Sequence, residues 1–194
     1  MTTSATQATI TVPTGPAGRA MAEPMSAELL DLMMEDHLNL ERQSAADYFA
    51  AAVWFAEREL TSFAEHLRDE AKQEQEHAAK FADYLISRGQ RPVLDTIEPP
   101  RLQWFDVEQV IANVFRMEAD VTASVLQLYG TAEKDIDRRT TVFLDPFVDA
   151  QHLSEHEAAY LLGRVKFAAG NPAAVMIIDA ELREGEAEPA KLEG

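Results

Sequence analysis

Helix-breaking residues are unevenly distributed along this chain, and their positions constrain the fold more than any other feature. Of the four prolines between residues 26 and 169, three fall within one stretch, GQRPVLDTIEPPRLQW at 89–104. The sequence on either side is dominated by Ala, Leu, Glu, Met and Gln, which are strong helix formers. The sequence therefore predicts long helices interrupted by one long connection.

Four long helices and a short fifth fit this punctuation. We expect them at about 26–55, 62–88, 106–134, 141–169 and 171–182, with Ser26 and Asn171 as N-caps and with Gly89 and Gly170 ending the helices before them. Pro146 either kinks the fourth helix or marks its true start. A connection as long as 89–104 suggests that the chain crosses from one end of a bundle to the other, so that the flanking helices run parallel. The predicted fold is an all-α four-helix bundle with a long crossover and a short C-terminal helix.

The two ends of the chain differ in composition from the predicted helical part. Residues 1–24 are rich in Thr, Ala, Gly and Pro and carry one basic side chain, Arg19, which predicts a flexible tail. Residues 184–194 are predicted to be frayed, so that 25–183 form one domain. The N-terminal stretch lacks the pattern of a secretory signal or transit peptide, and we expect a cytoplasmic protein.

Composition excludes several classes of function. With 34 acidic against 17 basic residues and a net charge of −17, the surface would repel nucleic acid, so cations are the better small partners. The apolar runs are too short to span a membrane. Because the sequence has no cysteine, any redox site would have to use carboxylate, imidazole or phenol groups or a bound metal.

The predicted buried stripe of each helix turns polar halfway along its length. Stepping by three and four residues gives an acid, amide or imidazole at mid-stripe in each of the four long helices, at Glu41, at Glu70, Glu74 and His77, at Glu118, and at Gln151. In the first helix this stripe contains Leu30, Met34, His37, Glu41, Ser44, Tyr48, Ala51 and Phe55. An isolated charge in a bundle core costs several kcal/mol unless it is neutralised or ligated. The residues predicted to converge on bound cations are Glu41, Glu74, His77, Glu118 and Gln151.

The ligand types suggest which metal. Glu74 and His77 lie at i and i+3 and so share a helix face, as in bundles that carry Glu on some helices and Glu-x-x-His on others. Oxygen-rich ligation with one imidazole suits iron or manganese, and zinc could compete. Interhelical salt bridges, or a misjudged phase of the stripes, remain the alternative explanation.

At this point the sequence resembles the ferritins, and most closely the prokaryotic, cyanobacterial-type ferritins. The resemblance covers about Met25 to Arg183 and is carried by NLERQSAADYF, EAKQEQEHAAKFADYL, MEAD, FLDPFVDAQHLSEHEAAYLLGRVKFA and IIDAELR, which occur in the order found in that family. It implies iron storage and detoxification. Fe2+ would be oxidised by O2 or H2O2 at a dinuclear ferroxidase centre, and ferric mineral would be kept in a hollow shell of about 24 identical subunits.

The resemblance also implies a role for each residue. Glu41 and His77 would hold the first iron, Glu74 would bridge the two ions, Glu118 would hold the second, and Gln151 would lie beside it. Tyr48 matches the ferritin tyrosine next to the centre, a candidate electron donor or hydrogen-bond partner.

Departures from the family pattern also matter. Many bacterial ferritins have acids where this chain has Gln73, Ala150 and Ser154, so the usual third iron site is in doubt, and Glu70 is the candidate replacement as a transient ligand. No haem is expected, because bacterioferritins bind it through a methionine of the second helix and this segment has none. A diiron oxidase or peroxide-detoxifying bundle without storage, and a metal-free helical interaction protein, remain alternatives.

Overall fold

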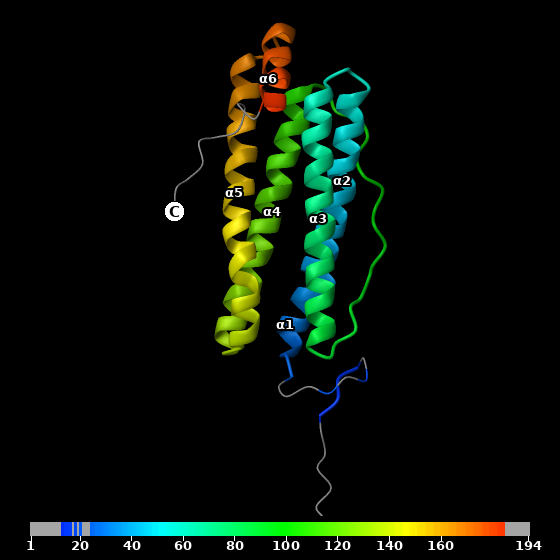
Figure 1. Cartoon of the computed structure of the whole chain (residues 1–194), viewed down its shortest axis with the longest axis vertical. Helices are drawn as coiled ribbons and strands as arrows, with labels where there is room; N and C mark the ends of the chain where they lie inside the picture. Colours follow the sequence, from blue (N-terminus) through cyan, green and yellow to red (C-terminus); the bar gives the residue numbers. More distant parts are fainter. Residues whose placement is uncertain (1–12, 17, 19, 21–23, 185–194) are drawn as a thin grey trace, which may run out of the picture.

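The computed structural model describes residues 13–16, 18, 20 and 24–184; most of the predicted tail at 1–24, and 185–194, lie outside the described residues. The described chain is helical in seven segments: α1 (Ala27–Asp31), η1 (Leu32–His37), α2 (Leu38–Ala56), α3 (Thr61–Ser87), α4 (Val107–Lys134), α5 (Arg138–Ala168) and α6 (Pro172–Glu184). The long helices lie side by side, and α6 lies at one end of the bundle (Figure 1). The predicted all-α bundle with a short fifth helix is confirmed.

The long connection between α3 and α4 runs the length of the bundle (Figure 1), so these two helices are parallel as predicted. Polar side chains of α2 form hydrogen bonds with the backbone of this connection. Asn39 accepts from the Asp95 amide at 3.0 Å, Gln43 accepts from the Glu98 amide at 2.8 Å, and Arg42 donates to the Asp95 carbonyl at 2.8 Å. These bonds satisfy backbone groups that would otherwise lack a partner in an extended segment.

The first predicted helix contains a π-helical segment, η1, that the sequence reading missed. The predicted stripe placed Leu30 and Met34 in the core, but the structure buries Leu29 and Met33 and leaves the predicted pair only partly covered. A π-helical turn holds more residues than an α-helical turn, so it shifts the phase of every residue on its N-terminal side. From His37 onward the predicted phase holds, with Glu41, Ser44 and Tyr48 buried.

Helix α5 begins at Arg138, three residues before its predicted start, and Pro146 lies inside it. The earlier start has a local cause, since Asp137 accepts from the Thr140 amide as the N-cap. The two predicted N-caps are confirmed. Ser26 accepts from the Leu29 amide at the start of α1, and Asn171 accepts from the Ala173 amide at the start of α6.

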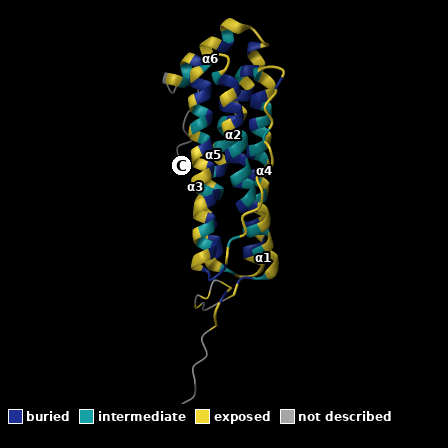
Figure 2. Ribbon diagram, turned by 90° about the vertical axis from the view of Figure 1, so that its right-hand side faces the viewer, coloured by how far each residue is buried: buried dark blue, intermediate teal, exposed yellow. Residues whose placement is uncertain are grey.

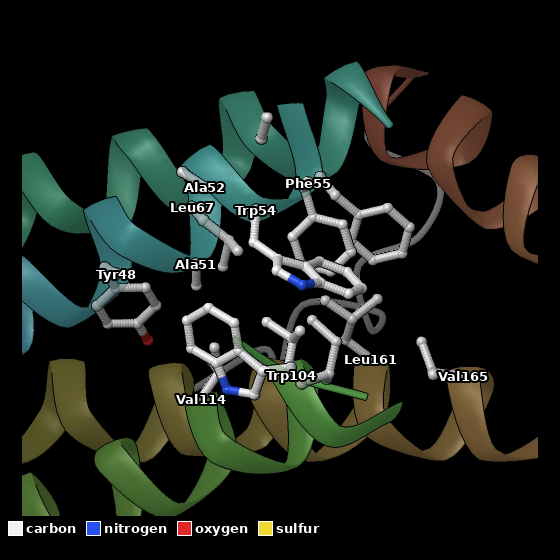
Figure 3. Packing of buried hydrophobic residues seen from close by; sticks show 14 of the residues in the cluster. Tyr48, Ala51, Ala52, Trp54, Phe55, Leu67, Trp104, Val114, Leu161 and Val165 are labelled. Atoms are coloured by element: carbon white, nitrogen blue, oxygen red, sulfur yellow. The ribbon is translucent and has the colours of Figure 1, made fainter. Parts of the chain in front are cut away.

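The hydrophobic core consists of two clusters of buried residues. Buried residues occur along the length of the bundle (Figure 2). One cluster surrounds Trp54, Phe55 and Trp104 near α6, and the other surrounds Leu29, Met33 and Phe81 near the opposite end. Figure 3 shows the first cluster, with Tyr48 at its edge. The buried polar residues Glu41, Glu74, Glu118 and Gln151 belong to neither cluster.

Candidate metal centre

Three of the predicted ligands come together in the bundle. Nδ1 of His77 lies 3.8 Å from Oε2 of Glu41 and 3.7 Å from Oε2 of Glu74, and one ligand atom from each residue lies within 4.8 Å of the others. Two atoms that each lie about 2.1 Å from a common ion are roughly 3 to 4 Å apart. The spacing of these three groups therefore suits a single ion.

Burial makes this arrangement costly without a cation. Glu41 is 1% exposed and Glu74 is 3% exposed, and Oε2 of each has no hydrogen-bond partner. A buried carboxylate oxygen without a partner loses the hydration it had in the unfolded chain. The donor set of two carboxylates and an imidazole thus fits a hard divalent ion such as Fe2+.

The pKa values of the three groups show that they compete for protons. Burial and the nearby Glu41 raise the pKa of Glu74, whereas contacts with Glu74, His37 and His77 outweigh burial and lower the pKa of Glu41. Burial opposes ionisation of His77, but the two carboxylates outweigh it and raise the pKa of the imidazole to about 10. Protons therefore compensate part of the negative charge that a metal ion would otherwise compensate.

Glu118 is held separately from this group by hydrogen bonds. Tyr48 donates its hydroxyl hydrogen to Oε1 of Glu118, and the Gln151 amide donates to Oε2 at 2.5 Å and to the Glu118 carbonyl at 3.1 Å. The predicted second-site residues Glu118 and Gln151 are thus in contact with each other and with Tyr48. Glu118 is not among the three residues whose ligand atoms converge.

The remaining candidate, Glu70, is one turn before Glu74 on α3 and is partly buried. Its Oε1 accepts from the amide of Gln73 at 3.1 Å, the residue that stands where many ferritins have an acid. Burial, followed by the negative charge of Glu118, raises the pKa of Glu70 to about 7. A proton on this carboxyl group has to leave before the group can bind a cation.

Sequence reasoning placed His37 on the buried stripe but did not include it among the site residues. Its side chain is fully buried, with Nε2 3.0 Å from Oε1 of Glu41. The spacing of His37 and Glu41, i and i+4 on one helix face, is the signal that could have identified it.

A groove of about 380 Å3 lies beside the centre and is lined by His77, Lys80, Val142, Phe143, Pro146, Phe147 and Ala150. The His77 side chain is 17% exposed, whereas those of Glu41 and Glu74 are at most 4% exposed. The groove therefore meets the centre at His77.

Comparison with known proteins gives a family match. Residues 33–168 match the model of the ferritin-like domain. A bacterial non-heme ferritin of Staphylococcus epidermidis is 32% identical over 127 residues, covering 66% of this chain and 76% of that protein. One of Escherichia coli O6:H1 is 25% identical over 149 residues, covering 77% and 90%.

The fold agrees with solved structures as well. An open pore ferritin from the hyperthermophilic archaeon Archaeoglobus fulgidus superposes with a TM-score of 0.78 at 26% identity, covering 82% of this chain and 98% of that chain. No described helix has the length and apolar character needed to cross a membrane. The family match spans most of the chain and includes all the candidate ligands, so the chain belongs to the ferritin family, among the prokaryotic non-haem ferritins.

Proposed function

We propose that this protein is a ferroxidase that stores the iron it oxidises. The observation that carries the proposal is the convergence of Glu41, Glu74 and His77, with two buried carboxylate oxygens that lack a hydrogen-bond partner. Iron is here the substrate, and family membership supports an iron-handling role.

In the proposed mechanism the first Fe2+ binds Glu41, Glu74 and His77, and a second binds between Glu74 and Glu118. Glu74 bridges the two ions. Gln151 holds the Glu118 carboxylate in place, and Glu70 binds ions transiently on their way to or from the pair. Each Fe2+ gives up one electron, so a pair delivers two electrons to O2 or H2O2. The bundle holds two ions in fixed positions and excludes bulk water.

The assembly and compartment in this proposal follow the family. Subunits would form a closed shell of about 24 copies that stores ferric mineral in the cytoplasm. Exposed apolar residues at the α6 end, including Phe167 at 93% and Met176 at 66%, support burial against other subunits.

The test is anaerobic addition of about two Fe2+ per subunit, the capacity of a two-metal site, followed by mixing with O2 while ferric absorbance is recorded. We expect rapid oxidation by the wild type on a large assembly that retains iron. Glu74→Ala should lose the rapid phase while remaining helical, with Glu76→Ala as the control because that exposed acid lies two residues away on α3.

Three results would contradict the proposal or a part of it. Oxidation at the protein-free rate would show that the protein has no ferroxidase activity. Oxidation by a small oligomer that retains no iron would instead indicate a diiron oxidase without storage. Full-rate oxidation by Glu74→Ala would exclude the bridging role of that carboxylate.

A further inference from the structure

His37 is the last residue of η1 and is held in place by two contacts with neighbouring helices. Its ring packs edge-on against Phe81 of α3, with ring centroids 4.4 Å apart. Its Nδ1 lies 2.9 Å from the hydroxyl of Ser124 on α4. The imidazole is fully buried, so its second nitrogen, Nε2, has no access to water.

Nε2 of His37 has no hydrogen bond in the structure, and Oε1 of Glu41 lies 3.0 Å from it. The other oxygen of the same carboxylate, Oε2, faces His77 at 3.8 Å. The two oxygens of Glu41 are therefore in different surroundings. One lies beside a potential N–H donor, and the other lies within the group that would bind the ion.

We propose that His37 is a positioning residue that holds Oε1 of Glu41 through an Nε2–H donor, so that Glu41 binds metal through Oε2 alone. The proposal rests on the proposed function in one respect, that Glu41 is a metal ligand. A carboxylate offers only acceptors to its neighbours, so the nitrogen that faces it has to carry the proton.

Ser124 can complete this arrangement, because its hydroxyl lies 2.9 Å from Nδ1 and can donate to it. When the neutral imidazole carries its proton on Nε2, Nδ1 is an acceptor and receives the Ser124 hydroxyl hydrogen. The series Ser124, His37, Glu41 then runs from α4 through η1 to the metal ligand. Groups that orient a ligand in this way typically change metal affinity by about 10- to 100-fold when removed.

His37 acts through Glu41 in this proposal because it lies outside the converging group. The described residues whose ligand atoms lie within 4.8 Å of one another are Glu41, Glu74 and His77. His37 lies four residues before Glu41 and so on the same helix face.

The experiment uses Co2+ without O2 on the assembled wild-type protein, on three variants and on a Glu41→Ala control, because Co2+ reports its coordination by visible absorption. His37→Leu removes the donor and keeps an apolar side chain against Phe81. His37→Gln keeps an N–H donor. Ser124→Ala removes the hydroxyl that faces Nδ1 of His37. Thermal unfolding and assembly size confirm that each variant folds.

We expect His37→Leu to weaken the first Co2+ by about tenfold and to reduce the intensity of the visible bands, because Glu41 becomes free to bind through both oxygens and raise the coordination number. His37→Gln should restore both the affinity and the spectrum. Ser124→Ala should give a smaller loss in the same direction.

Three outcomes would overturn the proposal: a His37→Leu variant with wild-type affinity and spectrum, a His37→Gln variant as impaired as His37→Leu, or a Glu41→Ala control that leaves the Co2+ titration unchanged. If the wild type binds Co2+ as expected and fails to oxidise Fe2+, the proposed ferroxidase function fails and the role of His37 stands.

Discussion

The hydroxyl of Tyr48 on α2 donates a hydrogen bond to Oε1 of Glu118 on α4, although the two residues are 70 positions apart in the sequence. Both side chains are buried, at 2% and 1% exposed. Because Gln151 donates to the other carboxylate oxygen, Glu118 is fixed from two sides by two different helices. Tyr48 is thereby coupled to the carboxylate proposed to hold the second iron.

We expect Tyr48→Phe to keep binding of the first metal ion and to change the kinetics of Fe2+ oxidation. Removal of the hydroxyl leaves Oε1 of Glu118 buried without a donor, which should lower the free energy of unfolding by about 1–3 kcal/mol. Stopped-flow absorbance and thermal unfolding, each with and without Zn2+, measure the two effects.

Phe49→Leu is the matched control for that variant, since Phe49 is the next residue and is 56% exposed. Tyr48 is a core residue without a role in oxidation if the rate and any transient radical signal of Tyr48→Phe equal those of the wild type.

Metal binding should release protons from the centre. Glu74 has a raised pKa, and that of His77 is raised to about 10, so both groups hold protons at pH 7 and must lose them to become ligands. Affinity for Zn2+ therefore rises with pH. We expect roughly two protons released per first ion, measured by calorimetry in buffers that differ in ionisation enthalpy.

Glu74→Gln tests the source of these protons, because the amide cannot release one. The variant should release about one proton fewer per ion than the wild type. A heat of binding that is independent of the buffer would contradict the proton release and place both groups in their deprotonated forms before metal binds.

Asp179 of α6 caps the start of α3 from outside that helix. Its Oδ1 accepts from the amides of Ser62 and Phe63 at 3.0 and 2.9 Å, while Leu60, the local N-cap residue, provides no side-chain bond. Asp179→Ala should cost about 1 kcal/mol of stability and loosen α6. We expect Asp179→Asn to retain most of the stability, because its carbonyl oxygen still accepts.

Thermal unfolding and hydrogen exchange at α6 check this prediction. Equal melting temperatures for wild type and Asp179→Ala would show that α6 is held by Val175 and Ile178, which pack in the adjoining hydrophobic cluster. Loss of the large assembly in Asp179→Ala alone would link the cap to subunit association.

Much of the candidate centre was predictable because helix periodicity is a local property. The steps that place Glu74 and His77 on one face of α3, and Glu118 on the buried face of α4, require only an unbroken α-helix. In the same way, the three prolines in 89–104 predicted the crossover that makes α3 and α4 parallel. The family match supports the ferritin resemblance, while the cyanobacterial-type assignment stays a prediction.

Other features depend on contacts between distant segments. The π-helical turn at 32–37 shifts the buried face to Leu29 and Met33, and helical propensity alone does not distinguish such a turn from an α-helix. Asp137 caps α5 locally, and only the folded bundle brings Arg88 within 2.9 Å of the same carboxylate.

The sequence by itself determined the helices, their buried stripes and the residue types available for metal binding, because each follows from the spacing of neighbours along the chain. Only the tertiary structure decided which of those groups meet. It brings Glu41 together with Glu74 and His77, pairs Glu118 with Tyr48 and Gln151, and sets His37 against Glu41. The physical reason is that side-chain partners are chosen by the phase and depth at which packed helices face one another, and these are fixed by the whole core.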